Sequence, residues 1–191
     1  CERAPERAQL PKLCYQVAGV LKTHGYHVMA LANARIPLVK GRDAHTGMEF
    51  DISFLGELPV QNSALLRTYS QLDPRVHPLV LLVKQWSKHY AICGASDCFL
   101  SSYSYQLLLL HFLQRTHPPV LPVLQSDAPP LGPIATRVTI GQLDCSFHCD
   151  AAAVRRAFTT ANTGTVGELL MGFFEFYGLL FDSPRVCVSI H

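Results

Sequence analysis

Apolar positions along the chain change their spacing twice. At 7–24 they recur at helical spacing and stop at Gly25, which predicts a helix that ends there. The period then becomes two, which predicts strands at 26–31, 34–40 and 48–54, with a turn at 42–47 between the last two. We therefore expect part of a sheet with a helix packed on it, and we expect the remainder of that sheet upstream of residue 1.

From residue 62 the pattern is mostly helical. Asn62 or Ser63 is expected to cap a helix through Ser70, and Ser101 or Ser102 to cap another through Gln114. The other elements that we expect are helices at 79–90 (after Pro74 and Pro78), 151–157 and 166–176, a proline-rich extended crossing at 118–133, and strands at 138–140 and 186–190. The fold class is α+β: a partial sheet followed by a mainly helical part.

Composition narrows the class of protein. Of 191 residues, 49% are hydrophobic and 16% charged, which excludes a disordered chain. Uninterrupted apolar runs reach only about five residues, so no membrane span is expected, and no secretory signal is present. The net charge of +2 is too small to indicate a nucleic-acid binder by itself. The positive surplus lies at 58–115, where a phosphate site or simply a solvated basic face is expected.

The seven cysteines are scattered, and several lie in apolar stretches. This usage is typical of reduced thiols in an intracellular protein rather than of a disulfide framework. A structural zinc site is an alternative, although the spacings fit no strong zinc pattern. Its ligands would come from Cys93, Cys98, Cys145, His148 and Cys149.

Asp51 stands in an otherwise apolar predicted strand. Alternation places Asp51 and Ser53 on one face of that strand, and the neighbouring aromatic and aliphatic residues on the other. A buried carboxylate in a strand is unfavourable unless it has a partner. The partner is either a basic side chain of the neighbouring strand, Arg35 or Lys40, or a metal ion.

Two features of the helical part favour a phosphate site. Lys84 and Lys88 are four residues apart on one predicted helix, where an anion between them would offset their repulsion. Ser102 and Tyr103 open the next helix, whose free N–H groups attract phosphate and whose aromatic ring could stack on a base. The alternatives are two solvated lysines, a capping serine and a core tyrosine.

The order of these motifs resembles the terminal uridylyltransferases and atypical poly(A) polymerases, which belong to the DNA polymerase β-like nucleotidyltransferases. The matching segments are ARIPLVK at 34–40, MEFDISF at 48–54, NSALLRTY at 62–69, DPRV at 73–76, VKQWSK at 83–88, LSSY at 100–103, PVLPVLQ at 119–125 and VGELLMGFFEFY at 166–177. The last one resembles the poly(A)-polymerase-associated motif. The resemblance implies residues 1–57 as the later part of a palm and 58–191 as a helical central domain, with the associated region at about 160–191.

The resemblance implies two-metal phosphoryl transfer with three catalytic aspartates. Asp51 matches the third, and so it is the expected catalytic residue and ligand of Mg²⁺, with Mn²⁺ as an alternative. Residues 1–33 contain no aspartate and no Gly-Ser pair, so the first two aspartates have no match here. We expect this chain to be a fragment that is not competent for catalysis by itself.

The same resemblance assigns nucleotide contacts. Asn62 and Ser63 match positions that bind the ribose, and Lys84 and Lys88 match the triphosphate-binding lysines. The remaining matches are Ser102 for a phosphate and Tyr103 for base stacking. Glu168 is the expected reader of the base edge, its alternative being a helix N-terminal carboxylate.

The expected activity is transfer of UMP from UTP to an RNA 3′-hydroxyl, with AMP transfer or an inactive RNA- or protein-binding relative as alternatives. The expected partners are UTP, an RNA 3′ end and proteins of an RNA-processing complex, with no membrane. The expected compartment is intracellular, with mitochondria favoured over the cytoplasm.

Overall fold

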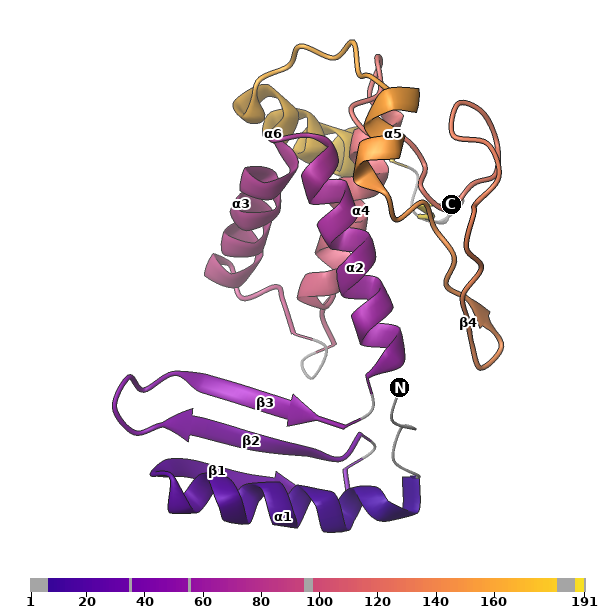
Figure 1. The fold of residues 1–191 in the computed structure, drawn as a ribbon. Coiled ribbons are helices and arrows are strands. Elements are labelled where there is room, and N and C mark those ends of the chain that lie inside the picture. The colour runs from indigo at the N-terminus through magenta and orange to yellow at the C-terminus, as the bar shows by residue number, and fades with distance from the viewer. Residues whose placement is uncertain (1–6, 35, 55, 95–97, 182–187, 191) are drawn as a thin grey trace. The chain divides into compact units, whose positions relative to one another are not determined.

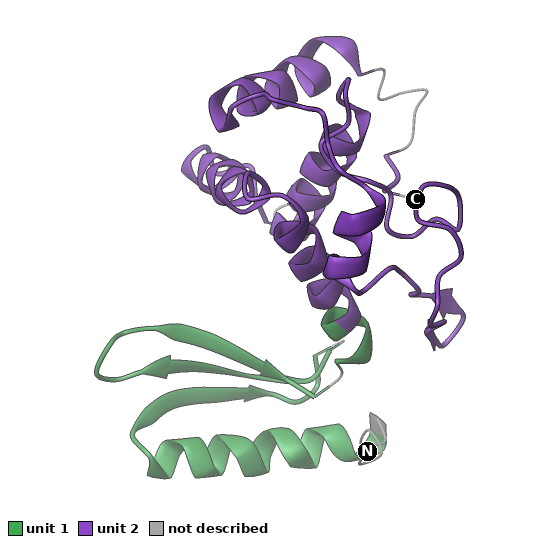
Figure 2. Cartoon of the chain, turned by 45° about the horizontal axis from the view of Figure 1, so that its top comes forward, with its two compact units in different colours: residues 1–60 green, residues 61–191 purple. Residues whose placement is uncertain are grey.

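The structure is a computed structural model that describes residues 7–34, 36–54, 56–94, 98–181 and 188–190 (Figure 1). The chain forms two compact units, Cys1–Val60 and Gln61–His191, which Figure 2 colours separately. Each unit is described by itself below.

Unit 1 begins with the predicted helix. A short 3₁₀ turn at Arg7–Gln9 leads into α1 (Leu10–Thr23), which is followed by Gly25 at a φ of 84°. A left-handed φ of this kind favours glycine, and the Gly25 amide donates to the Lys22 carbonyl at 3.2 Å. The helix and its glycine stop are therefore confirmed.

Three strands follow α1 and form one antiparallel sheet in the order β1-β2-β3. They are β1 (Tyr26–Leu31), β2 (Leu38–Asp43) and β3 (Glu49–Ser53). Helix α1 packs on one face of the sheet, where Cys14, Ala18, Ala32 and Val39 form a small core. Figure 1 shows α1 running along the sheet.

Strand β2 is displaced from its predicted range. The chain turns after β1, where the Ala34 amide donates to the Leu31 carbonyl, and the strand begins only after Pro37. At its other end β2 continues into the predicted turn, because Asp43 is bound there. Its carboxylate accepts hydrogen bonds from the His45 amide at 3.0 Å and the Thr46 hydroxyl at 2.7 Å.

Unit 2 is mainly helical. Its elements are α2 (Glu57–Leu72, which starts in unit 1), α3 (Val76–His89), α4 (Ser102–Arg115), α5 (Ala151–Ala157), α6 (Val166–Glu175), a π-helix at Phe176–Leu180, and a hairpin of β4 (Thr139–Ile140) and β5 (Leu143–Asp144). Helices α2, α3, α4 and α6 share one core, which includes Tyr69, Leu79, Leu109 and Phe173. These helices form the upper bundle in Figure 1.

Two predicted helix starts are wrong. Helix α2 begins at Glu57, so Asn62 and Ser63 lie inside it rather than at its cap. Helix α3 begins at Val76, so Pro78 is in its first turn rather than before it. Proline is tolerated in the first turn of a helix, where its missing N–H has no intrahelical acceptor. Pro78 is therefore part of the first turn of α3 instead of preceding the helix.

The predictions for the later elements are mixed. Ser101 caps α4, and its hydroxyl accepts from the Ser104 amide at 3.1 Å, as expected. Helix α5 has the predicted bounds, whereas β5 was missed because it is only two residues long. The strand predicted at 186–190 lies partly outside the described residues, and its described part, 188–190, is not a strand.

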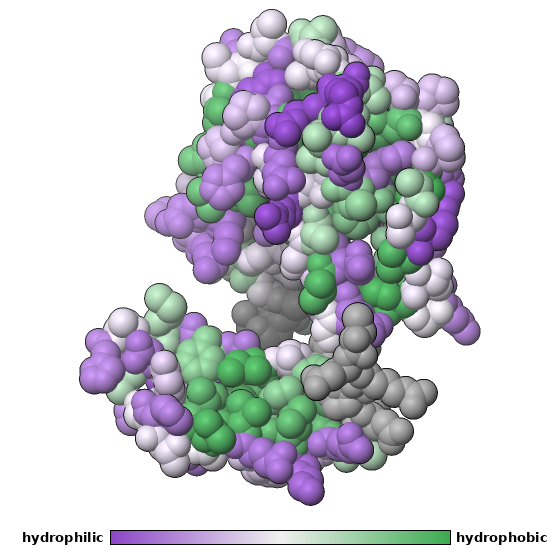
Figure 3. All heavy atoms as spheres, viewed as in Figure 1, coloured by the Kyte–Doolittle hydropathy of each residue, from purple (hydrophilic) through white to green (hydrophobic). Residues whose placement is uncertain are grey.

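The surface of each unit mixes polar and apolar residues (Figure 3). On unit 1, apolar side chains gather over α1 and the sheet in this view, and Tyr15 and Val20 of α1 are 61% and 59% exposed. Within the part of the chain that the structure describes, no helix has both the length and the apolarity to cross a bilayer.

Candidate functional site

The open face of the unit 1 sheet carries the candidate catalytic residue. Asp51 is exposed on β3, opposite Lys40 of β2, and Glu49 is opposite Arg42. Because α1 covers only the other face of the sheet, the Asp51 carboxylate pays no desolvation cost that a partner would have to offset. The expected cost of burying its carboxylate is therefore absent, and the metal ion as its partner stays a prediction.

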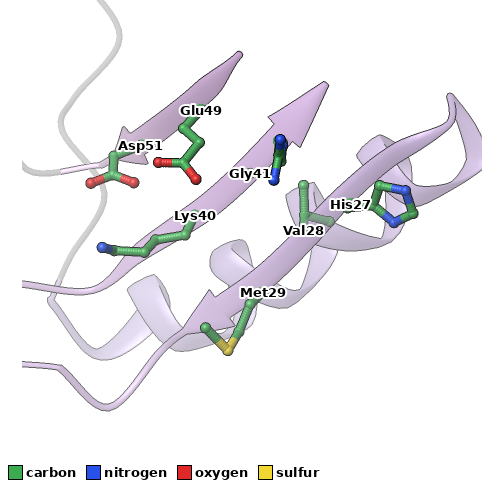
Figure 4. A pocket seen from close by; sticks show the side chains of 8 residues that line it. His27, Val28, Met29, Lys40, Gly41, Glu49 and Asp51 are labelled. Carbon is green, nitrogen blue, oxygen red and sulfur yellow. The ribbon is translucent and has the colours of Figure 1, made fainter. Parts of the chain in front are cut away.

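A shallow depression of about 450 Å³ lies on this open face. Its lining residues are His27, Val28, Met29, Lys40, Gly41, Arg42, Glu49 and Asp51. In Figure 4 the Asp51 and Glu49 carboxylates and the Lys40 side chain project from the same side of the sheet. Glu49 was not among the predicted site residues, although its spacing of two residues from Asp51 places both side chains on one face of the strand.

Asp51 forms no salt bridge with another residue that the structure describes. In the described part of the chain no nitrogen–oxygen contact within 4.0 Å joins Lys40 to Asp51, although the two residues are directly opposite each other. The other proposed partner, Arg35, lies outside the described residues. The Asp51 carboxylate is thus accessible to a ligand, and Lys40 supplies positive charge beside it.

The carboxylates of this face can supply part of the ligand set of a hard cation. Asp51 and Glu49 offer oxygen ligands of the kind that Mg²⁺ prefers. Among the residues described, no group of three or more His, Cys, Asp or Glu side chains is arranged to hold a metal ion. Asp51 can therefore supply one ligand of a Mg²⁺ site, and the rest of the ligand set would come from elsewhere.

The zinc alternative finds no support in the described residues, because no three of its proposed ligands form a group that could hold a metal ion. Those ligands are Cys93, Cys98, Cys145, His148 and Cys149. Several of these side chains have other partners. The Cys93 thiol lies 3.1 Å from the Ser102 hydroxyl, and the His148 Nε2 lies 3.1 Å from the Ser126 carbonyl oxygen.

The two candidate triphosphate lysines lie on α3 of unit 2. Lys84 and Lys88 are both exposed, while Val83 and Ser87 of the same helix are buried against the core. The lysines therefore project from the outer face of α3, one turn apart. Their ammonium groups are accessible to an anion, as the predicted role requires.

Helix α4 places the next two candidates. Ser101 is its N-cap, Ser102 its first residue and Tyr103 its second. Both Ser102 and Tyr103 are half-buried, and burial raises the pKa of the Tyr103 hydroxyl. Helix α4 is held against α3 by an edge-to-face contact of Tyr105 with Trp86, with ring centroids 5.9 Å apart.

Asn62 and Ser63 lie in the second turn of α2, Asn62 half-buried and Ser63 exposed. Glu168 lies in the first turn of α6 and forms a capping box with Thr165. Its carboxylate accepts from the Thr165 amide at 2.7 Å and the Thr165 hydroxyl at 2.9 Å, and these bonds hold the pKa of Glu168 below its usual value. Glu168 thus stabilises the N-terminus of α6, which is the alternative role that the sequence offered for it.

A family model described as poly(A) RNA polymerase, mitochondrial-like, central palm domain matches residues 2–71. The poly(A) RNA polymerase GLD2 of Danio rerio is 34% identical over 179 residues, which are 94% of this chain and 34% of that protein. The chain thus spans about a third of the length of this relative.

Solved structures show the same similarity. The Cid1 poly(U) polymerase with Mg 3′-dATP bound superposes with a TM-score of 0.84 at 31% identity, covering 98% of this chain and 57% of that one. The mtPAP structure in complex with UTP gives 0.80 at 30% identity, covering 95% and 39%. These matches confirm the predicted fold class and the resemblance drawn from the ordered motifs. The chain therefore belongs to the atypical poly(A)/poly(U) polymerase family of nucleotidyltransferases.

Proposed function

We propose that the full-length protein containing this chain adds nucleotides to RNA 3′ ends without a template, and that the nucleotide is AMP from ATP. The observation that carries the proposal is the similarity to poly(A) RNA polymerase GLD2 along 94% of the chain. This choice replaces UMP, which the motifs alone favoured. AMP fits the relatives better, because the sequence matches are named poly(A) RNA polymerases.

In this proposal the RNA 3′-oxygen forms a bond to the α-phosphorus, and the bond between the α-phosphorus and the bridging oxygen breaks to release pyrophosphate. The chemistry that bound Mg²⁺ supplies is activation of the hydroxyl and neutralisation of charge on the triphosphate. Asp51 is the ligand that this chain would contribute, and its carboxylate, which is exposed, would also take up the hydroxyl proton. Mn²⁺ would satisfy the same oxygen ligand.

The helical residues take the binding roles. Lys84 and Lys88 neutralise the triphosphate from the outer face of α3, and Ser102 contacts a phosphate at the start of α4. Tyr103 stacks on the base, and Asn62 and Ser63 bind the ribose. Glu168 reads the base edge from the first turn of α6.

UMP transfer is the second candidate, because the superposed Cid1 structure is that of a poly(U) polymerase. The test incubates the full-length protein with an RNA primer, Mg²⁺ and each of the four nucleoside triphosphates separately. Extension with ATP alone, or at the highest rate with ATP, supports the proposal. Extension mainly with UTP supports the second candidate, and no extension with any nucleotide supports the inactive RNA- or protein-binding relative.

For the compartment, we propose mitochondria, in line with the mitochondrial-like description of the matching palm family. For partners, we propose proteins of an RNA-processing complex. Subcellular fractionation followed by affinity purification from the isolated organelle tests both, and enrichment of the protein in the cytosolic fraction would contradict the first.

A further inference from the structure

The thiol of Cys93 contacts a side chain of the proposed nucleotide site. Its Sγ lies 3.1 Å from the hydroxyl oxygen of Ser102, so that one of the two groups donates a hydrogen bond to the other. Ser102 is the first residue of α4 and the proposed contact of a phosphate. Cys93 lies in the connection between α3 and α4, and the resemblance to the family assigns it no role.

The hydroxyl of Ser102 is not used to cap its own helix, because Ser101 does that. The Ser101 hydroxyl accepts from the Ser104 amide at 3.1 Å and lies 2.9 Å from the Ser104 hydroxyl. The amide of Ser102 is among the first N–H groups of α4, which have no acceptor inside the helix. A phosphate at this end of α4 can therefore accept from the backbone and from the Ser102 hydroxyl together.

Contacts on both sides of Cys93 hold it in place. The Tyr105 hydroxyl donates to the carbonyl of Ile92, the residue before Cys93, at 2.9 Å. On the other side the Gly94 amide donates to the Leu100 carbonyl at 3.1 Å, and Cys93 itself pairs with Leu100 in a β-bridge. Cys93 is half-buried and packs against the core of unit 2. Its thiol therefore has a fixed place beside the start of α4.

The direction of the hydrogen bond between Cys93 and Ser102 matters for phosphate binding. A serine hydroxyl has one proton to donate and lone pairs that accept, whereas the oxygens of an ionised phosphate only accept. When Ser102 donates its proton to a phosphate, its oxygen can interact with Cys93 only by accepting, so the thiol has to be the donor. When the sulfur accepts instead, the Ser102 proton points to Cys93 and is not available to the phosphate.

We propose that Cys93 is a positioning residue for the triphosphate: its S–H donates to the Ser102 oxygen and thereby orients the Ser102 proton toward a phosphate of the bound nucleotide. This inference rests on the proposed function and adds a residue to its phosphate contact. Cys93 acts through Ser102 and contacts no substrate itself. The role differs from that of a zinc ligand, because a thiolate bound to zinc has no proton to donate.

The test measures the Kd of a non-hydrolysable ATP analogue for the full-length protein by titration calorimetry in the presence of Mg²⁺. Cys93→Ala removes the donor and is expected to raise the Kd by about 2- to 10-fold, the effect of one net hydrogen bond. Cys93→Ser keeps a donor at the same place and should bind within about 2-fold of the unmodified protein. In primer extension, Cys93→Ala should raise KM for ATP while kcat changes less.

Two further variants separate this role from packing. Cys93→Val fills the space of the thiol without a donor, so it should raise the Kd as Cys93→Ala does. Cys145→Ala is the matched control, because the Cys145 thiol is also half-buried and also has a hydrogen bond, to the Leu143 carbonyl at 3.7 Å. Cys145 follows the β4–β5 hairpin and is not among the proposed nucleotide contacts, so Cys145→Ala should leave the Kd unchanged.

A double-variant cycle shows whether Cys93 acts through Ser102. In a Ser102→Ala background the hydroxyl is absent, so Cys93→Ala should raise the Kd of the ATP analogue no further. Adenosine provides a second comparison, because it has the base and the ribose but no phosphate. Its Kd should be the same for the unmodified protein, Cys93→Ala and Ser102→Ala. A thermal melt of each variant measures its fold.

Each result decides one question. If the unmodified protein extends RNA and Cys93→Ala binds the analogue equally well, the positioning role is overturned and the proposed function stands. Additive losses in Cys93→Ala and Ser102→Ala, or normal binding by Cys93→Val, also overturn the positioning role. An unmodified protein that binds the analogue but extends no RNA overturns the proposed function alone, since the variants still report on phosphate binding. An unmodified protein that does not bind the analogue overturns both.

Discussion

At the residue scale, Asp51 lies on the exposed face of β3, opposite the face on which α1 packs. The alternating pattern of 48–54 placed Asp51 and the apolar residues on opposite faces, and the exposed and half-buried positions of β3 follow that pattern. The environment of the polar face was not predictable in the same way. It depends on whether another element covers the sheet, and α1 covers only the apolar face.

Asp51→Asn in the full-length protein should abolish nucleotide addition while preserving the fold. The change removes a negative charge needed for a divalent cation, and Asp51 is exposed, so no core contact is lost. Primer extension measures the activity, and circular dichroism with a thermal melt measures the fold. Ser53→Ala, on the same face of β3, is the control that should keep activity. Full activity of Asp51→Asn would end its catalytic assignment.

Tyr103→Ala should weaken nucleotide binding without changing the base preference. Stacking on an aromatic ring contributes about 1–3 kcal/mol per base, which corresponds to a Kd roughly 5- to 150-fold higher. Titration calorimetry with a non-hydrolysable ATP analogue measures the affinity, and Tyr103→Phe, which keeps the ring, should bind normally. An unchanged affinity of Tyr103→Ala would instead identify a tyrosine that only packs against the core.

His111 of α4 predicts a pH dependence of stability. It is 4% exposed, and its Nδ1 lies 2.8 Å from the Tyr177 hydroxyl, which itself donates to the Leu108 carbonyl. Because that hydroxyl donates to Leu108, Nδ1 of His111 is the donor in its bond to Tyr177. Burial, helped by the nearby Arg115, lowers the pKa of His111 below 6.5.

The direction of this pH dependence follows from the difference in proton uptake between the unfolded and the folded state. Below about pH 6.5 the unfolded chain takes up a proton at His111 that the folded state resists, so the free energy of unfolding should fall as the pH is lowered. His111→Gln should make the free energy of unfolding less dependent on pH between 5 and 7.5, as measured by chemical denaturation. His89→Gln is the control at an exposed position, and it should leave the pH dependence as it is in the unmodified protein. Equal slopes for all three proteins would contradict the prediction.

At the element scale, side-chain caps mark where three of the described helices begin. Ser101, Asp150 and Thr165 each accept backbone N–H groups at the starts of α4, α5 and α6. The start of α3 was mispredicted because Pro78 is compatible with a first helical turn as well as with the residues before a helix. The start of α2 was mispredicted because Asn62 and Ser63, taken as caps, lie inside the helix.

Ser101→Ala should destabilise unit 2 by about 0.5–2 kcal/mol, because the Ser104 amide would lose its acceptor. Ser101→Gly should lower the free energy of unfolding by only roughly a few tenths of a kcal/mol, since glycine suits an N-cap better than alanine. Chemical denaturation monitored by far-UV circular dichroism measures both. Equal stability of Ser101→Ala and the unmodified protein would show that α4 is held by its core contacts alone.

At the scale of the whole molecule, the two units differ in how much core they contain. The buried cluster of unit 1 consists of Cys14, Ala18, Ala32 and Val39, whereas that of unit 2 includes large side chains of α2, α3, α4 and α6. A small core rarely offsets the conformational entropy lost on folding. The units should therefore differ in their ability to fold alone.

A peptide of residues 1–60 should be largely unfolded by circular dichroism, and a fragment of residues 61–191 should keep its helical signal and melt cooperatively. The reason is the difference in buried apolar area. A cooperative melt of the shorter peptide would contradict this expectation and show that the sheet with α1 is an independent folding unit.

The sequence by itself determined the local elements. The change from helical to strand period at Gly25, the bounds of β1 and α5, and the cap of α4 all depend on contacts within a few residues. The order of motifs was likewise sufficient to identify the family, because it needs no three-dimensional information.

Only the tertiary structure decided what surrounds each side chain. The contacts of Arg75 with Asn162 join positions 87 residues apart, and the hydrogen bond between His111 and Tyr177 joins positions 66 residues apart. The accessible carboxylate of Asp51 likewise depends on which sheet face α1 covers. Periodicity reports the direction of a side chain along its own element, whereas burial, partner and charge state depend on elements that reach it only when the chain folds.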